Sequence, residues 1–129
     1  MSCSIASAVM DVIEDEKLMD RAHDVGLHLK ACLAKLKEKY EIIGDIRGHG
    51  MFVGIDLVKN RDTREPFTKA AEHAISRFRE EKILMQRDGP YENVLKMKPP
   101  LKFSKDNVDK FVSVFDLILE EISALNSLE

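Results

Sequence analysis

A glycine-punctuated β pattern within an otherwise helical chain most constrains how this sequence can fold. Residues 42–58 read IIGDIRGHGMFVGIDLV, which is rich in isoleucine, valine and phenylalanine. Such a run is typical of strands. We expect two short strands, about 42 to 47 and 51 to 58. They are joined by a tight turn at Gly48-His49-Gly50, because glycine adopts the positive φ angles that such turns need.

Helical periodicity surrounds this pair of strands. Apolar residues spaced three and four apart predict a helix over residues 4–15 and a longer one from Leu18 to near Lys39. Pro66 suits the first turn of a third helix, which we expect to run to about Lys82. The same apolar spacing predicts a last helix, up to about residue 125, with Ser104 as its N-cap.

Two further short strands are expected between the third and last helices, at residues 83–86 (ILMQ) and 94–98 (VLKMK). In the second of these, alternation places Leu95 and Met97 on one face and Val94, Lys96 and Lys98 on the other. The order ααββαββα predicts an α+β fold, a small and mostly antiparallel sheet of three to four strands packed with helices. We expect a single domain over residues 1–129, with a helical N-terminal part (4–39) and a sheet-containing part (42–125).

Composition narrows the classes of partner. The chain has 129 residues and a formal net charge of −3, so no bulk attraction to nucleic acid or to an anionic membrane is expected. No apolar run approaches membrane-spanning length. Asp11 and Glu14 interrupt the first apolar segment too early for a signal peptide. Cys3 and Cys32 show neither a CxxC nor a metal spacing, so we expect two buried thiols in a reducing compartment.

The common catalytic and metal motifs are missing from the sequence. Of the four histidines, His23 and His28 are five residues apart and lie on different helix faces; with no HExxH motif, we expect surface histidines and no metal site. There is no GxSxG elbow for a hydrolytic triad. The GHG turn lies between two strands with no helix after it, so a dinucleotide fold is not indicated.

The remaining candidate is the stretch NVLKMKPPLKFS, residues 93–104, where Lys96 and Lys98 share one face of a strand that ends at two prolines. Arg87 and Lys102 are their charged neighbours in the sequence. One interpretation is a solvated lysine edge that protects the sheet from aggregation. The other is an anion pocket, since a lysine ammonium binds carboxylate or phosphate as a point charge. The residues alone leave both open.

Three stretches resemble one family. IIGDIRGHGMFVGIDLV resembles the segment V-x-x-V-R-G-x-G-L-x-x-G-I-E-L of class III pyridoxal-phosphate-dependent aminotransferases, and NVLKMKPPLKFS resembles their V-I-R-F-x-P-P-L-x-I. SCSIASAVMDVIEDEKLMDRA is similar to the helix that follows their G-G-N-P-V sequence. The resemblance covers almost the whole chain in the right order. It implies the small C-terminal domain of a fold-type I enzyme, and the apolar helix directly after Met1 fits a chain cut from a longer one.

The resemblance implies that the Schiff-base lysine and the phosphate-binding residues lie upstream of this chain. We therefore expect no catalytic and no cofactor-binding residue here, no cofactor on the isolated chain, and no activity from it alone. In the full-length enzyme we expect pyridoxal 5′-phosphate, the large domain as a partner, a homodimer, and a mitochondrial or cytoplasmic location. No nucleic acid or membrane partner is expected.

The sequence departs from the family pattern at one residue that would bind the substrate. Lys96 stands where the family commonly has an arginine that grips the substrate carboxylate, and lysine lacks the planar fork of arginine. The K-x-K-P-P form resembles most the alanine-glyoxylate aminotransferase 2-like subgroup of phospholyases, which act on O-phosphoethanolamine or phosphohydroxylysine. This implies Lys96 as a substrate-binding residue, with Lys98 either sharing the role or solvated.

Two alternatives to the phospholyase stay open. The first is a transaminase of the alanine-glyoxylate type, in which Lys96 binds a carboxylate. The second belongs to another class: a freestanding, non-catalytic α+β binding module.

Overall fold

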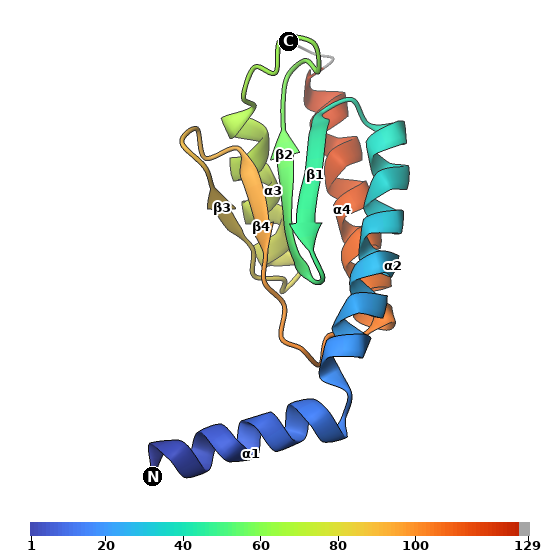
Figure 1. Cartoon of the computed structure of the whole chain (residues 1–129). Coiled ribbons are helices and arrows are strands. Elements are labelled where there is room, and N and C mark those ends of the chain that lie inside the picture. Colours follow the sequence, from blue (N-terminus) through green and yellow to red (C-terminus); the bar gives the residue numbers. More distant parts are fainter. Residues whose placement is uncertain (127–129) are drawn as a thin grey trace.

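Three helices cover one face of a four-stranded sheet, and another helix extends away from it (Figure 1). The computed structural model describes residues 1–126. The elements are α1 (Ser2–Asp15), α2 (Leu18–Lys39), β1 (Ile43–His49), β2 (Phe52–Leu57), α3 (Thr68–Glu80), β3 (Gln86–Asp88), β4 (Val94–Met97) and α4 (Lys105–Asn126). Their order is the predicted ααββαββα, and the α+β class is confirmed.

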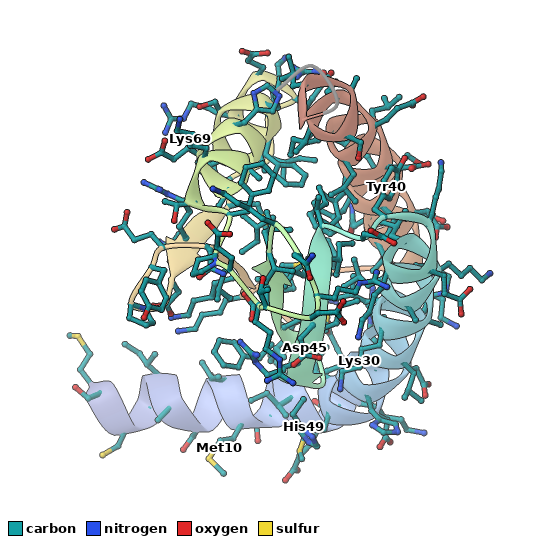
Figure 2. All side chains as sticks on the ribbon, turned by 90° about the horizontal axis from the view of Figure 1, so that it is seen from above. Met10, Lys30, Tyr40, Asp45, His49 and Lys69 are labelled. Carbon is teal, nitrogen blue, oxygen red and sulfur yellow. The ribbon has the colours of Figure 1, made fainter. Side chains whose placement is uncertain are left out.

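The sheet has the strand order β1-β2-β4-β3, with every neighbouring pair antiparallel. Burial alternates along the two central strands as period-two geometry requires. The side chains of Val53, Ile55, Leu57, Leu95 and Met97 are buried in the core with the helices. Figure 2, seen from above, shows α3 and α4 on one side of the sheet, with the labelled Asp45 and His49 on the side away from them.

We call that second side of the sheet the open face. The cross-strand register places Phe52, Gly54 and Asp56 of β2, Val94 and Lys96 of β4, and Gln86 and Asp88 of β3 on this face. None of the seven is fully buried. The prediction that Leu95 and Met97 point inward while Lys96 points outward is confirmed, so the candidate lysines lie on a surface that the helices leave uncovered.

The β1–β2 turn lies directly against helix α2, where the helix carries a glycine. The turn lies at Gly50 and Met51 and not at Gly48-His49-Gly50, because the strand pairing continues to His49 opposite Phe52. Gly50 has the positive φ expected of a glycine in this turn, +57°. A Cβ atom built on Gly26 would lie 2.3 Å from the carbonyl oxygen of Gly50 and 2.6 Å from its carbonyl carbon. The close approach explains a glycine in mid-helix, where it otherwise weakens helix propensity.

The start of α4 has the cap that the sequence predicts. The backbone N–H of Asn107 donates to Ser104 Oγ at 3.2 Å, while Asn107 Oδ1 accepts from the backbone N–H of Ser104 at 3.0 Å. This reciprocal pair satisfies two donors that a helix end leaves free.

Three further boundaries and the expected burial of the cysteines were wrong. The strand expected at residues 83–86 is β3, Gln86–Asp88, because pairing with β4 begins only at Gln86. Pro66 lies before α3, in an isolated bridge with Val58. That helix stops at Glu80, since the N–H of Ile83 turns back to the carbonyl of Phe78 at 2.8 Å. Both cysteines are free, with Cys3 exposed and Cys32 only partly buried.

Helix α1 buries none of its residues. Its apolar side chains Ile5, Val9 and Val12 are 60%, 52% and 47% exposed, and the helix extends beyond the end of the sheet (Figure 1). No helix within residues 1–126 combines the length and apolar character needed to cross a membrane.

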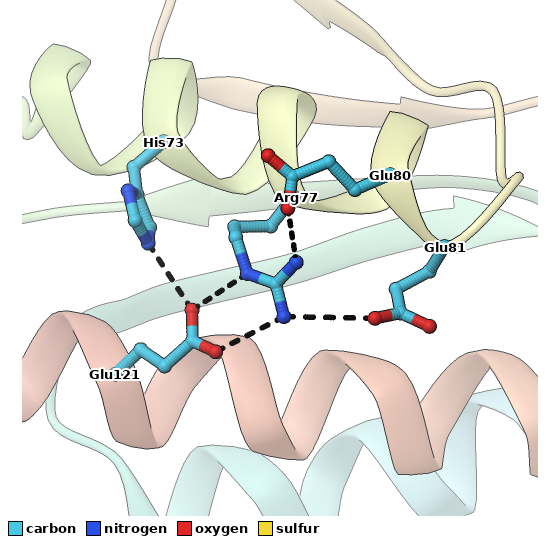
Figure 3. Close-up of polar contacts among 5 residues, drawn as sticks. All are labelled: His73, Arg77, Glu80, Glu81 and Glu121. Carbon is cyan, nitrogen blue, oxygen red and sulfur yellow. Dashed lines mark hydrogen bonds and ion pairs between the residues drawn. The ribbon is translucent and has the colours of Figure 1, made fainter.

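Helices α3 and α4 are joined by a cluster of charges around one guanidinium (Figure 3). Arg77 donates from Nε to Glu121 Oε2 at 2.9 Å and from a terminal nitrogen to Oε1 at 3.1 Å, a two-point contact. His73 Nε2 lies 3.3 Å from the same carboxylate. The Arg77 contact is the main reason that the pKa of Glu121 lies below its ordinary value of 4.5.

This lowered pKa predicts a pH-dependent contribution to stability. A carboxylate whose pKa is depressed by folding stabilises the protein above its unfolded pKa, and the contribution is lost as pH falls through the folded value. The free energy of unfolding of the wild type minus that of Glu121→Gln is therefore expected to be positive at pH 7 and to shrink below about pH 4.5. Urea unfolding at several pH values measures it.

Glu80→Gln is the matched control, because Glu80 contacts the same guanidinium but its side chain is 66% exposed, against 39% for Glu121. An exposed pair contributes about 0–1 kcal/mol, so the control is expected to change little. A difference for Glu121→Gln that is independent of pH would contradict the prediction.

Candidate functional site

The two candidate lysines lie close together at the edge of the open face. Lys96 is the central residue of a row across the sheet, paired with Gly54 on one side and Gln86 on the other. Its ammonium donates to Asp88 Oδ2 at 2.7 Å. That hydrogen bond is the largest cause of the lowered pKa of Asp88, followed by the backbone N–H of Gly89. Lys96 is thus held in position as one half of an ion pair, with its side chain 28% exposed.

Phe52 lies beside both ammonium groups. The Lys98 Nζ is 5.2 Å from the centre of the Phe52 ring and the Lys96 Nζ is 6.0 Å from it, within the range of cation–π attraction. Asp88 is the one carboxylate with an ion pair to either lysine among residues 1–126, so the local balance is two positive charges against one negative. This arrangement can accept a small anion with more than one negative charge.

The other two basic neighbours from the sequence do not join them. Arg87 is turned toward the helix side, where it pairs with Glu72 at 3.2 Å and with Glu92 at 3.3 Å. Lys102 forms an ion pair with Glu16, in the link between α1 and α2. The structure therefore brings together Lys96 and Lys98, and it separates Arg87 and Lys102 from them.

A cavity of about 340 Å³ opens where β4 leaves the sheet at the two prolines. Lys96 and Lys98 line it together with Lys82 and Lys110, which the sequence analysis did not consider. Its apolar lining includes Ile83, Met85, Met97, Pro99, Pro100, Phe103 and Phe111. Four lysines around an apolar pocket favour an anion with a short carbon chain.

Arg47 is a further charged residue on the open face that the sequence analysis missed. It pairs across the sheet with Gly54, so it belongs to the same row as Lys96, with only a glycine between them. Its guanidinium contacts Asp45 at 3.2 Å and Asp56 at 3.6 Å. A signal was present, because Arg47 is the arginine of the R-G-x-G pattern in the segment that resembles the family.

Lys96 does not have the surroundings of a Schiff-base lysine. A lysine that forms a Schiff base needs a desolvated, neutral amine, whereas Lys96 is paired with a carboxylate. Within residues 1–126 every buried side-chain nitrogen and oxygen atom has a hydrogen-bond partner. Lys96 therefore suits a contact with an anion better than the formation of a Schiff base.

A second group of chemically active side chains lies on the helices, away from the open face. Among residues 1–126, His28, Cys32 and Asp109 place one donor atom each within 4.8 Å of one another. The histidines and the cysteines were each compared only among themselves in the sequence, so the pair His28 and Cys32, four apart on one helix face, was missed.

Comparison with known proteins identifies the family. The family model described as Aminotransferase class-III matches residues 1–119. The chain is 45% identical over 116 residues to an "Alanine--glyoxylate aminotransferase 2-like" protein of Drosophila melanogaster, covering 89% of this chain and 24% of that protein. It is 44% identical over 120 residues to "Ethanolamine-phosphate phospho-lyase homolog 1" of Caenorhabditis elegans, covering 92% of this chain and 26% of that protein. The chain thus spans about a quarter of the length of these relatives.

Comparison with solved structures agrees with this family assignment. A phospholyase from Arthrobacter in complex with phosphoethanolamine superposes with a TM-score of 0.83 at 33% identity, covering 88% of this chain and 27% of that one. A Bacillus anthracis aminotransferase gives a TM-score of 0.85 at 29% identity, covering 92% of this chain and 28% of that one. An amine transaminase from an uncultivated Pseudomonas species, whose structure is described as PLP-bound, also matches, with a TM-score of 0.82 at 30% identity, covering 92% of this chain and 27% of that one. The fold is that of the fold-type I enzymes, and the chain belongs to the class III aminotransferase family.

Proposed function

We propose that this chain is the small C-terminal domain of a pyridoxal-phosphate-dependent phospholyase. The reaction would convert O-phosphoethanolamine or a related phosphorylated amine, with one water, to an aldehyde, ammonia and phosphate. The names of the Caenorhabditis elegans relative and of the Arthrobacter structure support this reaction. The observation that carries the proposal is that Lys96 and Lys98 both lie beside Phe52 on the open face. Asp88, which pairs with Lys96, is the one carboxylate with an ion pair to either lysine among residues 1–126.

The charge of the substrate decides between the two enzyme classes. A transaminase substrate presents a carboxylate, a planar monoanion that suits the fork of an arginine. Phosphoethanolamine presents a phosphate that is close to a dianion at pH 7 and has no carboxylate. Two ammonium groups against a single carboxylate leave a net positive site, which fits the phosphate better.

In this proposal Lys96 and Lys98 bind the phosphate of the substrate and stabilise the charge that grows on it as the C–O bond breaks. Asp88 keeps Lys96 on the open face until the phosphate arrives. Pyridoxal phosphate, held by the large domain, supplies the electron sink for removal of the substrate proton. The isolated chain, without that domain, is expected to be inactive.

The proposed partners follow from the same interpretation. The exposed apolar side chains of α1 and the uncovered open face are the surfaces that we assign to the contact with the large domain. We infer a homodimer for the full-length enzyme. A mitochondrial location is suggested by one relative of 39% identity over 122 residues, an Arabidopsis thaliana protein that is named mitochondrial; a cytoplasmic one stays open.

The alternative is a transaminase of the alanine-glyoxylate type, which the name of the Drosophila melanogaster relative favours. A freestanding binding module has lost its support, because the family match covers residues 1–119.

A direct assay separates the two reactions. The full-length protein, containing this chain and its large domain, is incubated with phosphoethanolamine, and in parallel with alanine and glyoxylate. Phosphate and acetaldehyde are expected in equal amounts from the first mixture, with no pyruvate from the second. Pyruvate formation without phosphate release would replace the phospholyase by the transaminase.

A further inference from the structure

Helices α2 and α4 carry a histidine, a thiol and a carboxylate that converge on one small volume. His28 and Cys32 are four residues apart on α2, so they lie one turn apart on the same helix face. Asp109 reaches them from α4. His28 Nε2 lies 2.7 Å from Asp109 Oδ1 and 3.8 Å from Cys32 Sγ. The same ring nitrogen therefore faces both other donors.

The types of the three donors select a class of metal. Thiolate sulfur and imidazole nitrogen are ligands of zinc and its first-row neighbours, and zinc also accepts a carboxylate oxygen. Magnesium and calcium prefer sites made of oxygen alone. A sulfur, a nitrogen and an oxygen thus favour Zn²⁺, with water as the fourth ligand.

The distances lie close to those of a tetrahedral site. With Zn–N and Zn–O near 2.0 Å and Zn–S near 2.3 Å, the donors of such a site stand about 3.3 to 3.6 Å apart. The sulfur-to-nitrogen distance of 3.8 Å is slightly longer than this range, and no two of the three donor atoms are more than 4.8 Å apart, so small side-chain movements bring them to it. The His28 to Asp109 contact has to lengthen by about half an ångström, a small rotation of a side chain that is 61% exposed.

We propose that His28, Cys32 and Asp109 form a site for Zn²⁺ that connects α2 to α4. On binding, a Zn–S, a Zn–N and a Zn–O bond form, the Cys32 thiol releases its proton to solvent, and a water completes the coordination. Both helices pack in the core, so the ion would stabilise their contact on the side away from the open face. The site does not depend on the proposed reaction at Lys96.

Cobalt(II) tests the site, because it takes the positions of zinc and a thiolate bound to it gives a charge-transfer band in the near ultraviolet. The titration uses the 129-residue chain carrying Cys3→Ser, so that Cys32 is the remaining thiol of the chain. One equivalent of Co²⁺ is expected to give the band, and Zn²⁺ is expected to abolish it. The additional change Cys32→Ser is expected to remove it.

Two further variants test the other ligands. His28→Gln is expected to weaken Co²⁺ binding more than the roughly 10- to 100-fold that loss of an outer-shell partner causes. Asp109→Asn is expected to weaken it by about 10-fold, at the lower end of that range, because it replaces the ligand that is most exposed. His23→Gln is the control, since His23 is exposed on α2 outside the cluster, and it is expected to bind as the parent does. Circular dichroism confirms that each variant is folded.

The proposal fails if the parent chain gives no band at one equivalent, or if the band persists in Cys32→Ser. Unchanged affinity in folded His28→Gln or Asp109→Asn would equally overturn it. In those cases the contact of His28 with Asp109 is a hydrogen bond between helices and nothing more.

Discussion

Replacing Lys96 by alanine in the full-length protein is expected to lower kcat/KM for phosphoethanolamine about 10- to 100-fold while the cofactor content stays unchanged. A hydrogen bond to a charged group contributes roughly 1.5 to 3 kcal/mol, and each 1.4 kcal/mol is a factor of ten. The variant also leaves Asp88 without the ammonium that holds it at 2.7 Å. Its negative charge would then face the phosphate. Phosphate release at varied substrate concentration, with pyridoxal phosphate measured after denaturation, gives both quantities.

Three companion variants separate the effect of the lost Lys96 charge from the effect of the unpaired Asp88 carboxylate. The double variant with Asp88→Asn removes the uncompensated carboxylate and is expected to recover part of the loss. Lys96→Arg keeps the charge and is expected to lose less than Lys96→Ala. Arg87→Gln is the control, because Arg87 is also basic but pairs on the helix side of the sheet. Unchanged turnover in Lys96→Ala would remove Lys96 from the substrate site and with it the main support for a phosphate substrate.

Local patterns of apolar and polar residues were sufficient to predict most of the fold. The alternation of apolar and polar residues placed Leu95 and Met97 in the core and Lys96 outside. Ser104 was identified as a cap because it precedes the apolar pattern of the last helix, and its partner Asn107 lies only three residues away. The family resemblance, carried by the glycine-rich hairpin and the K-x-K-P-P segment, gave the fold type. These features depend on neighbours in the sequence.

Features set by distant contacts could not be predicted. The position of β3 depends on pairing with β4 and differs from the apolar run at residues 83–86, since Ile83 and Met85 pack against the core without belonging to a strand. Arg61 lies in the loop between β2 and α3, and it donates to the carbonyls of Tyr40 and Ile43 at 2.9 and 3.1 Å at the end of α2. No local pattern indicates such a partner.

The residues of the candidate site also divide into those that the sequence predicts and those that only distant contacts bring together. Lys96 and Lys98 were found because they are two apart on a strand. Lys82 and Lys110 come to the same cavity from the end of α3 and from α4, which only the folded chain reveals. Arg87 and Lys102 are near in sequence but pair elsewhere, so proximity along the chain overestimated the cluster.

Replacing Gly26 by alanine is expected to destabilise the chain, although alanine normally favours a helix over glycine by about 1 kcal/mol. The new Cβ would lie 2.3 Å from the Gly50 carbonyl oxygen, a backbone atom that cannot rotate away. Helix and hairpin would have to separate, and such overpacking costs about 1 to 3 kcal/mol. Urea unfolding monitored by circular dichroism measures the net loss. In the full-length protein the shift would also move β2, whose Gly54 pairs with Lys96, so phosphate release should fall as well.

Gly54→Ala is the control for stability, because a Cβ there would meet Val94 at 3.4 Å, an ordinary contact with a side chain that can move. Its free energy of unfolding is expected to stay within about 1 kcal/mol of the wild type. If Gly26→Ala instead matched or exceeded the wild type, the hairpin turn would have to lie further from α2 than the 2.3 Å clash implies.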